Sequence, residues 1–192
     1  MKTAIFALAF AFATSSAFAT PITNGGFSTG TLSGWTTNGT TSVATDTIGS
    51  YAQLTGDKAA NVYTTLTQTL HLKAGDIFSG QAKFIAGDYL PYNDDAFVSI
   101  SGVNLFAASV SSVGNYGSTA LTSFTWTALT AGDYILNMGV ENRGDGGNAS
   151  ILQVRNFAVT SVVPEPGSIA LLGLGLLGAA ASRRRTAKNK KA

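Results

Sequence analysis

The chain has 192 residues, no cysteine and a single histidine, and its formal net charge is +2. Without cysteine it has neither disulfides nor a thiolate nucleophile, and with one histidine neither a zinc site nor a histidine-based triad is expected. The charge is uneven: residues 20–167 hold five basic and ten acidic side chains, a net charge of −5, whereas residues 168–192 hold six basic ones. Because an acidic body repels phosphate backbones, we expect no nucleic-acid partner.

The first residues have the features of a secretory signal peptide. Lys2 gives a basic start, residues 4–13 form an apolar run, and Ala17-Phe18-Ala19 supplies the small-x-small pattern of a cleavage site. We therefore expect signal peptidase to remove a signal helix at residues 1–19. The alternative, a retained membrane helix, is disfavoured because the apolar run has about half of the roughly 20 residues that a span needs.

The mature chain opens on a motif built from glycines and aromatic residues. Residues 24–27 read Asn-Gly-Gly-Phe, Gly30 follows, and residues 32–35 read Leu-Ser-Gly-Trp. This motif resembles the phrase N-G-G-F-E-x-G-x-x-x-G-W at the start of exported bacterial jelly rolls of the galactose-binding-like and other carbohydrate-binding kinds. The resemblance implies such a sandwich here. Ser28 stands where those domains have a glutamate near a structural calcium ion, so no metal is expected at this motif.

The body has the composition and periodicity of a β-protein. It is rich in Thr, Ser, Gly, Val, Tyr and Phe, and no stretch shows an apolar stripe at helical spacing. Turn signals separate alternating segments at residues 63–72, 77–85, 96–100, 103–110, 121–129, 134–141 and 151–162. The pattern predicts seven to nine strands in an all-β antiparallel sandwich or jelly roll, with an up-and-down barrel as the alternative. The Ser/Gly-rich residues 111–119 are expected to form a loop.

Five side chains in and around these segments carry specific expectations about burial. Trp35 and Trp126 are expected in the core rather than exposed to stack on a sugar, because buried tryptophan is the commoner case. Gln68 marks either a break in the strand at 63–72 or a polar interior position. Phe27 should anchor the first strand, and Leu129 is a candidate core residue.

Oxygen-bearing side chains gather in the loop before residue 96. Asp88, Asn93, Asp94 and Asp95 could together hold a structural calcium ion, which prefers carboxylate and carbonyl oxygen ligands. Asn142, Asp145 and Asn148 form a second oxygen-rich loop beside glycines. Neither loop has the EF-hand spacing, and the alternative for each is a solvated turn.

The residues suited to catalysis do not form a recognisable set. His71 lies in an alternating strand, where Leu70 and Leu72 point to the opposite face, so it is expected to meet solvent or a strand partner. Glu141 is the one glutamate of the folded body, and no spacing pairs it with a second carboxylate for glycoside hydrolysis. We therefore predict that the protein is not an enzyme and has no catalytic residues.

The C-terminal tail carries the most specific motif of the chain. Pro164-Glu165-Pro166 precedes an apolar segment at residues 168–181, and Arg183, Arg184 and Arg185 follow within a basic tail at 183–191. This order resembles the PEP-CTERM sorting signal, and residues 87–98 resemble a segment of exported PEP-CTERM sandwich proteins. The fourteen residues of the apolar segment, with a rise of about 1.5 Å each, reach roughly 21 Å and would form a short transmembrane helix. The arginines that follow this helix should stay on the cytoplasmic side.

Together these patterns predict three parts: a signal peptide at 1–19, a β-sandwich domain at 20–162 and a sorting signal at 163–192. The resemblance of the tail adds an expectation about processing. It implies that an exosortase of a Gram-negative bacterium cuts near the motif, after transient insertion in the inner membrane, and leaves the body at the cell surface or outside the cell. Such systems accompany exopolysaccharide, so we hypothesise a non-catalytic module that binds glycans. The alternative is a structural biofilm or adhesion protein without a sugar site.

Overall fold

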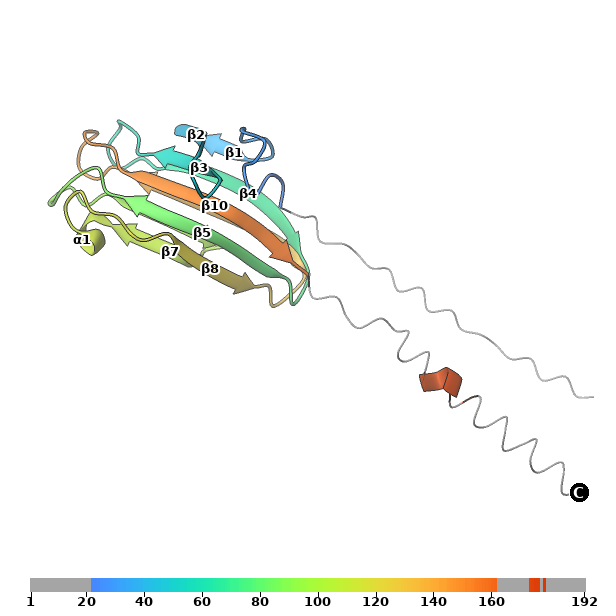
Figure 1. The fold of residues 1–192 in the computed structure, drawn as a ribbon. Coiled ribbons are helices and arrows are strands. Elements are labelled where there is room, and N and C mark those ends of the chain that lie inside the picture. The colour runs from blue at the N-terminus through green and yellow to red at the C-terminus, as the bar shows by residue number, and fades with distance from the viewer. Residues whose placement is uncertain (1–21, 162–172, 177, 179–192) are drawn as a thin grey trace, which may run out of the picture.

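The computed structural model describes residues 22–161, 173–176 and 178, and its body is a sandwich of two antiparallel sheets (Figure 1). Sheet A has the order β1-β4-β9-β6-β7, and sheet B has the order β2-β3-β10-β5-β8. In sheet A the strands are β1 (Thr36–Asn38), β4 (Thr64–Leu72), β9 (Gly132–Glu141), β6 (Asp95–Ile100) and β7 (Val103–Ser109). In sheet B they are β2 (Thr40–Thr45), β3 (Ser50–Thr55), β10 (Ile151–Thr160), β5 (Ile77–Ile85) and β8 (Thr122–Thr127).

The strand order is that of a jelly roll. Apart from β1 and β2, the sheets are β3-β10-β5-β8 and β4-β9-β6-β7, so four strands face four, and successive strands cross between layers except at the β6–β7 hairpin. The predicted all-β antiparallel sandwich is confirmed, and the barrel alternative is not adopted. Burial alternates along the strands, as in β5, because every second side chain packs into the space between the sheets.

The sequence missed the strands β1, β2 and β3 and one helical turn. Residues 36–55 are mostly Thr, Ser, Ala and Gly, and β1 and β2 are edge strands with few buried side chains, so they carry little apolar alternation. Residues 110–113 form α1 (Val110–Val113) at the start of the expected loop, because Ser109 and Ser112 form a capping box and Val110 is buried.

The N-terminal motif closes one side of the core, as its glycines predict. The backbone N–H of Phe157 donates to the Gly25 carbonyl at 3.0 Å, and a Cβ at Gly25 would lie 2.3 Å from the Phe157 oxygen. Phe27 is fully buried, and Trp35 is 8% exposed. Both therefore sit in the core, as expected, and the glycine allows the close approach of the two chain segments.

Gln68 does not break β4, and it is partly buried on the side of the strand that carries Leu66 and Leu70. Its Nε2 donates to the carbonyls of Thr23 and Gly34, and its Oε1 accepts the Thr23 N–H. Trp126 is partly buried against Tyr134, with ring centroids 5.0 Å apart. The expectation for Leu129 was wrong: it lies in the turn between β8 and β9 and is 85% exposed.

The two ends of the sandwich differ in what they carry. β10 ends at Thr160, which pairs with Ile77 at the start of β5, and the chain then continues towards residue 162. The loops 86–94 and 114–121 follow the other end of β5 and form what we call the loop end (Figure 1). The expected signal helix, Pro164-Glu165-Pro166 and Arg183–Arg185 lie outside the described residues. No helix within the described part of the chain is long and apolar enough to cross a membrane.

Candidate functional site

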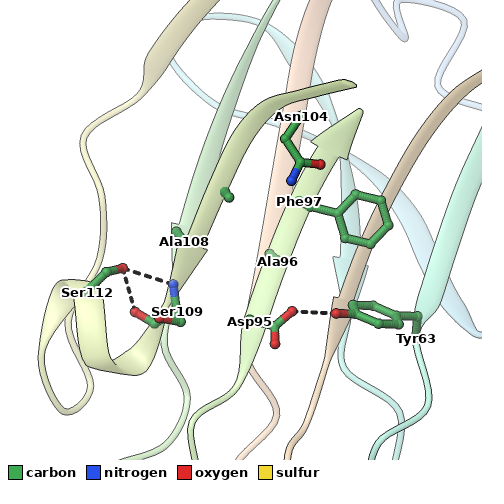
Figure 2. Close-up of a pocket in the computed structure, with 9 residues that line it drawn as sticks. Tyr63, Asp95, Ala96, Phe97, Asn104, Ala108, Ser109 and Ser112 are labelled. Carbon is green, nitrogen blue, oxygen red and sulfur yellow. Dashed lines mark hydrogen bonds between the residues drawn. The ribbon is translucent and has the colours of Figure 1, made fainter. Parts of the chain in front are cut away.

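A groove of about 470 Å³ lies on the outer face of sheet A, between β6, β7 and α1 (Figure 2). Phe97 and Tyr63 flank it on one side, with Ser109 and Ser112 on the other. The full lining is Tyr63, Asp95, Ala96, Phe97, Asn104, Ala107, Ala108, Ser109 and Ser112. Volumes of this size fall in the usual range of small-ligand sites.

The groove exists because a large ring has small neighbours on both adjoining strands. Alternation along β6 turns Ala96 and Val98 into the core and Phe97 outward. In register, Phe97 faces Ala107 on β7 and Gly139 on β9. A Cβ at Gly139 would come within 2.9 Å of the Phe97 ring, so glycine lets the ring lie over the sheet and alanine leaves the hollow beside it.

A second ring and a set of charges complete one end of the groove. The Tyr63 ring meets Phe97 edge-on, with centroids 5.2 Å apart, and its hydroxyl donates to Asp95 Oδ1 at 2.6 Å. Arg143 donates from Nε to Asp95 Oδ2 at 2.5 Å and from Nη2 to Glu141 Oε1 at 2.7 Å. Asn104 lies at the other end of the groove (Figure 2). The arrangement offers a ring flanked by hydroxyl, amide and carboxylate groups.

Burial and neighbouring charges set the protonation of this end. Burial raises the pKa of Glu141, and the negative charge of Asp95 adds to the effect. Burial and the hydrogen bond to Asp95 raise the pKa of Tyr63, so its hydroxyl stays a donor at any physiological pH. The hydrogen bond to Asp95 raises the pKa of Arg143, which remains a cation. Asp95 is therefore held from both sides, by a phenol and a guanidinium.

The structure does not gather the four residues predicted to hold calcium. Asp95 faces the groove, whereas Asp94 is fully buried and accepts from Ser150 Oγ at 2.6 Å and from the Arg143 N–H at 2.8 Å. Asn93 Oδ1 accepts the Ser111 N–H. Asp88 is 1% exposed, and its Oδ2 has no hydrogen-bond partner. Among the described residues, no three or more His, Cys, Asp or Glu are arranged to hold a metal ion.

The second oxygen-rich loop uses its side chains to hold the loop itself. Asn142 donates to the Asp57 carbonyl and accepts the Ser150 N–H, while Asp145 accepts the Gly147 N–H. These are bonds to the protein backbone, as in a structured turn. Calcium binding at either loop stays a prediction of the sequence.

His71 lies away from the groove. It is exposed and pairs with Asp133 across β4 and β9, near the end of the sandwich where β10 stops. The sequence had placed it facing solvent or a strand partner, and the structure shows both. The groove residues Tyr63, Phe97 and Asn104, and Arg143 beside them, were not singled out in advance. The one available signal was Phe97, an aromatic residue between the inward-facing Ala96 and Val98.

Comparison with known proteins bears on the tail and on the fold. Residues 162–185 match the PEP-CTERM protein-sorting motif. No curated protein matches the chain. The motif indicates an exported protein that an exosortase processes and that reaches the cell surface of a Gram-negative bacterium.

Several solved structures resemble the body at low identity. The complex of the carbohydrate-binding module TmCBM61 with beta-1,4-galactotriose is 16% identical, with a TM-score of 0.46 over 72% of this chain and 96% of that one. Family 16 Carbohydrate Binding Module-2 is 16% identical, with a TM-score of 0.43 over 73% and 99%. A cyclase from Fischerella sp. TAU is 14% identical, with a TM-score of 0.45 over 78% and 100%. These scores carry no argument about a ligand.

Proposed function

We propose that this chain, which carries a PEP-CTERM sorting motif at residues 162–185, is an exported, non-catalytic module that binds a neutral glycan in the groove on sheet A. Signal peptidase would release Thr20 as the new N-terminus. The apolar residues 168–181 would hold the tail in the inner membrane, with Arg183–Arg185 on the cytoplasmic side, until the exosortase acts. The body would then reach the cell surface or the extracellular polymer.

The observation that carries the proposal is the half-buried ring of Phe97 in a hollow edged by polar groups. A pyranose has an apolar C–H face, which packs on an aromatic ring, and a rim of hydroxyls, which need hydrogen-bond partners. Phe97 supplies the first, while Asn104 and the Asp95 carboxylate supply the second. Ser109 and Ser112 line the opposite wall.

The charges of the groove favour a neutral glycan. Asp95 and Glu141 together outnumber the single cation Arg143, and the body as a whole carries a net charge of −5 between residues 20 and 167. An acidic polysaccharide would therefore meet repulsion, which salt would screen over about 8–10 Å.

The same contacts support a binding role rather than hydrolysis. Asp95 lines the groove, but one of its oxygens accepts from Tyr63 and the other from Arg143. Glu141 is 3% exposed and bound to the same arginine. A retaining or inverting glycosidase needs two carboxyl groups free to reach the sugar. The second candidate function is a structural matrix protein without a sugar site. The burial of Trp35 and the polar outer face of sheet B support it.

Affinity electrophoresis tests the proposal. The full chain is expressed in an exosortase-bearing Gram-negative host, and the recovered protein is run in native gels containing neutral β-glucan, galactan or galactomannan, or acidic alginate. We expect a neutral polymer to retard it, and Phe97→Ala to weaken that retention at least about tenfold, or ~1.4 kcal/mol. Mass spectrometry of the same material should find Thr20 at the N-terminus.

Tyr51→Ala is the matched control, because Tyr51 is a partly buried ring on the outer face of sheet B, 4.8 Å from the Arg155 guanidinium. Its retention should equal that of the parent. Equal losses in the two variants would contradict the groove as the site. Free migration in every neutral polymer would favour the structural matrix protein.

A further inference from the structure

Three tyrosines form an exposed cluster at the loop end, apart from the groove. Tyr89 lies 5.6 Å from Tyr92, edge-on, and 5.8 Å from Tyr116 at a tilt of 40° between ring planes. Tyr89 is 39% exposed and Tyr116 is 60% exposed, and the neighbouring Leu90 is 50% exposed. None of these residues lines the groove. We call Tyr89, Tyr92 and Tyr116 the tyrosine cluster.

Backbone hydrogen bonds tie the two loops of the cluster together. The Tyr116 N–H donates to the Asp88 carbonyl at 2.9 Å, and the Leu90 N–H donates to Asn115 Oδ1 at 3.0 Å. The Tyr92 N–H closes a turn onto the Tyr89 carbonyl at 2.9 Å. The rings are therefore presented on a fixed frame, which lowers the ordering cost of binding.

Tyr116 adopts a backbone conformation that does not suit its side chain. Its φ is 55°, in the left-handed region where a bulky residue is an outlier and glycine or asparagine is preferred. The ring gains little from burial in return, since more than half of it is exposed. A residue whose backbone conformation is unfavourable and whose side chain adds little to the core is a candidate for a functional role.

The two loops that carry the cluster expose no charged side chain, and Tyr92 packs against Gly144, which lies between Arg143 and Asp145 in a third loop. Between residues 110 and 121 the chain has no charged side chain, and the two acids of residues 86–94, Asp88 and Asp94, are buried. Asn115 and Ser111 supply exposed amide and hydroxyl groups. The exposed rings of Tyr89 and Tyr116, beside the neutral hydrogen-bonding groups of their own loops, fit a neutral saccharide.

The cluster also lies at the opposite end of the body from Thr160, where β10 ends. β5 runs from Ile77, the partner of Thr160 near the tail, to Ile85, just before the tyrosine loops. Nine residues at about 3.3 Å each separate the two ends by roughly 30 Å. While the tail is held at a membrane or by an exosortase, the loop end is the part left free.

We propose that the tyrosine cluster is a second binding surface for neutral saccharide chains, with Tyr89 and Tyr116 as its stacking rings. It goes beyond the groove, because neither ring contributes to that site. Two sites on one body would let a single polymer, or two polymers, be held at once and would raise the overall avidity for an extended glycan.

Substitution of Tyr116 separates a binding role from a structural one. Tyr116→Asn suits the positive φ, so its melting temperature should stay within about 2 °C of the parent or rise, while retention by the neutral polymer in affinity gels falls about tenfold. Tyr116→Phe keeps the ring and should keep retention. Tyr89→Ala should weaken retention like Tyr116→Asn, and Leu129→Ala, an exposed aliphatic residue at the opposite end, should not.

The groove variant distinguishes this proposal from the proposed function. If both tyrosine variants lose retention while Phe97→Ala keeps it, the cluster stands and the groove fails; if all three lose it, both stand. Loss in Phe97→Ala alone would overturn the cluster, as would free migration of the parent in every neutral polymer. A fall of about 8 °C or more in the melting temperature of Tyr116→Asn would show that the ring is structural and would also overturn it.

Discussion

The aromatic side chains of the body fall into two groups, one enclosed between the sheets and one on the outer face of sheet A. Phe157 lies between the sheets, with ring centroids 5.6 Å from Trp35, 5.7 Å from Phe78 and 6.1 Å from Phe27. Phe97 lies on the outer face of sheet A and meets one ring, Tyr63. The same side chain therefore stabilises the fold in one place and remains available to a ligand in the other.

The outer faces of the two sheets show the same division. On sheet B the polar side chains satisfy one another: Gln81 bonds Ser123 and Asn156, and Arg155 bonds Asp46. The Arg155 guanidinium also covers the Tyr51 ring at 4.8 Å. On sheet A the small residues Gly139 and Ala107 leave the ring of Phe97 uncovered. A face whose groups are paired internally has little left to offer a ligand.

The largest expected effect separates the two phenylalanines. Phe157→Ala should lower the free energy of unfolding by about 3–5 kcal/mol, because it empties the centre of a ring cluster that cannot collapse fully. Phe97→Ala should cost less than about 1.5 kcal/mol, since its ring is packed on one side only. Urea unfolding measures both through the midpoint at constant slope. Similar losses in the two variants would break the comparison.

Arg143 tests whether the charges at the end of the groove depend on one cation. Arg143→Ala leaves Glu141 buried beside Asp95 without a counter-charge, so stability at pH 7 should fall by about 1–2 kcal/mol, a figure reduced because the arginine is half exposed. Protonation of Glu141 removes the unpaired charge, so the loss should shrink as the pH falls towards 4. Arg143→Lys should recover part of it. A loss that is the same at pH 4.5 and pH 7 would contradict this account.

The smallest expected effect is a change in how stability depends on pH, and it comes from the buried carboxyl group of Asp94. Burial raises its pKa despite the hydrogen bonds from Ser150 and Arg143, and the negative charges of Asp88 and Asp145 add to the shift. The folded state thus binds this proton more tightly than the unfolded one. Its contribution to stability is full below the ordinary carboxyl pKa near 4 and is lost as the pH rises through the raised value.

Asp94→Asn keeps an oxygen acceptor for the Arg143 N–H and removes the charge. The difference in melting temperature between the variant and the parent should therefore increase, in favour of the variant, by about 3 °C from pH 4 to pH 7. Asp57→Asn, at a partly exposed carboxylate that accepts the Ala59 N–H, is the control for a change of charge alone. Parallel melting curves for Asp94→Asn and the parent across this range would refute the raised pKa.

The parts of the fold that the sequence predicted are those with a strong local pattern. The segments at 77–85 and 134–141 alternate cleanly and correspond to β5 and β9 within two residues. β1 and β2 were missed because edge strands of threonine and serine bury little and need no apolar alternation. β3 was missed because its inward-facing residues are only Ala52 and Leu54, which make too short an apolar pattern to recognise. The prediction that Leu129 is a core residue was wrong because a leucine that continues the alternation of a strand can still lie in the turn that follows the strand.

The candidate site was harder to predict than the fold. The Asp88–Asp95 loop drew attention for its carboxylates, yet its residues separate into a buried aspartate bound to Ser150 and an outward one bound to Arg143. Tyr63 lies 32 residues before Asp95 in the chain, and nothing local links them. Their meeting depends on the pairing of β4 with β9 and of β9 with β6.

Local patterns along the chain were enough to predict the sorting motif, the acidic body, the antiparallel sandwich and the burial of Phe27 and Trp35. These features are linear or have a period of two residues, so neighbours in the chain suffice to encode them. The positions of the groove and of the tyrosine cluster, in contrast, depend on the tertiary fold. Register between strands placed Gly139 and Ala107 beside Phe97, and two distant loops brought Tyr89 to Tyr116. The groove exists because the strands on both sides of Phe97 have small residues there, and only the packed sheet shows which residues are neighbours.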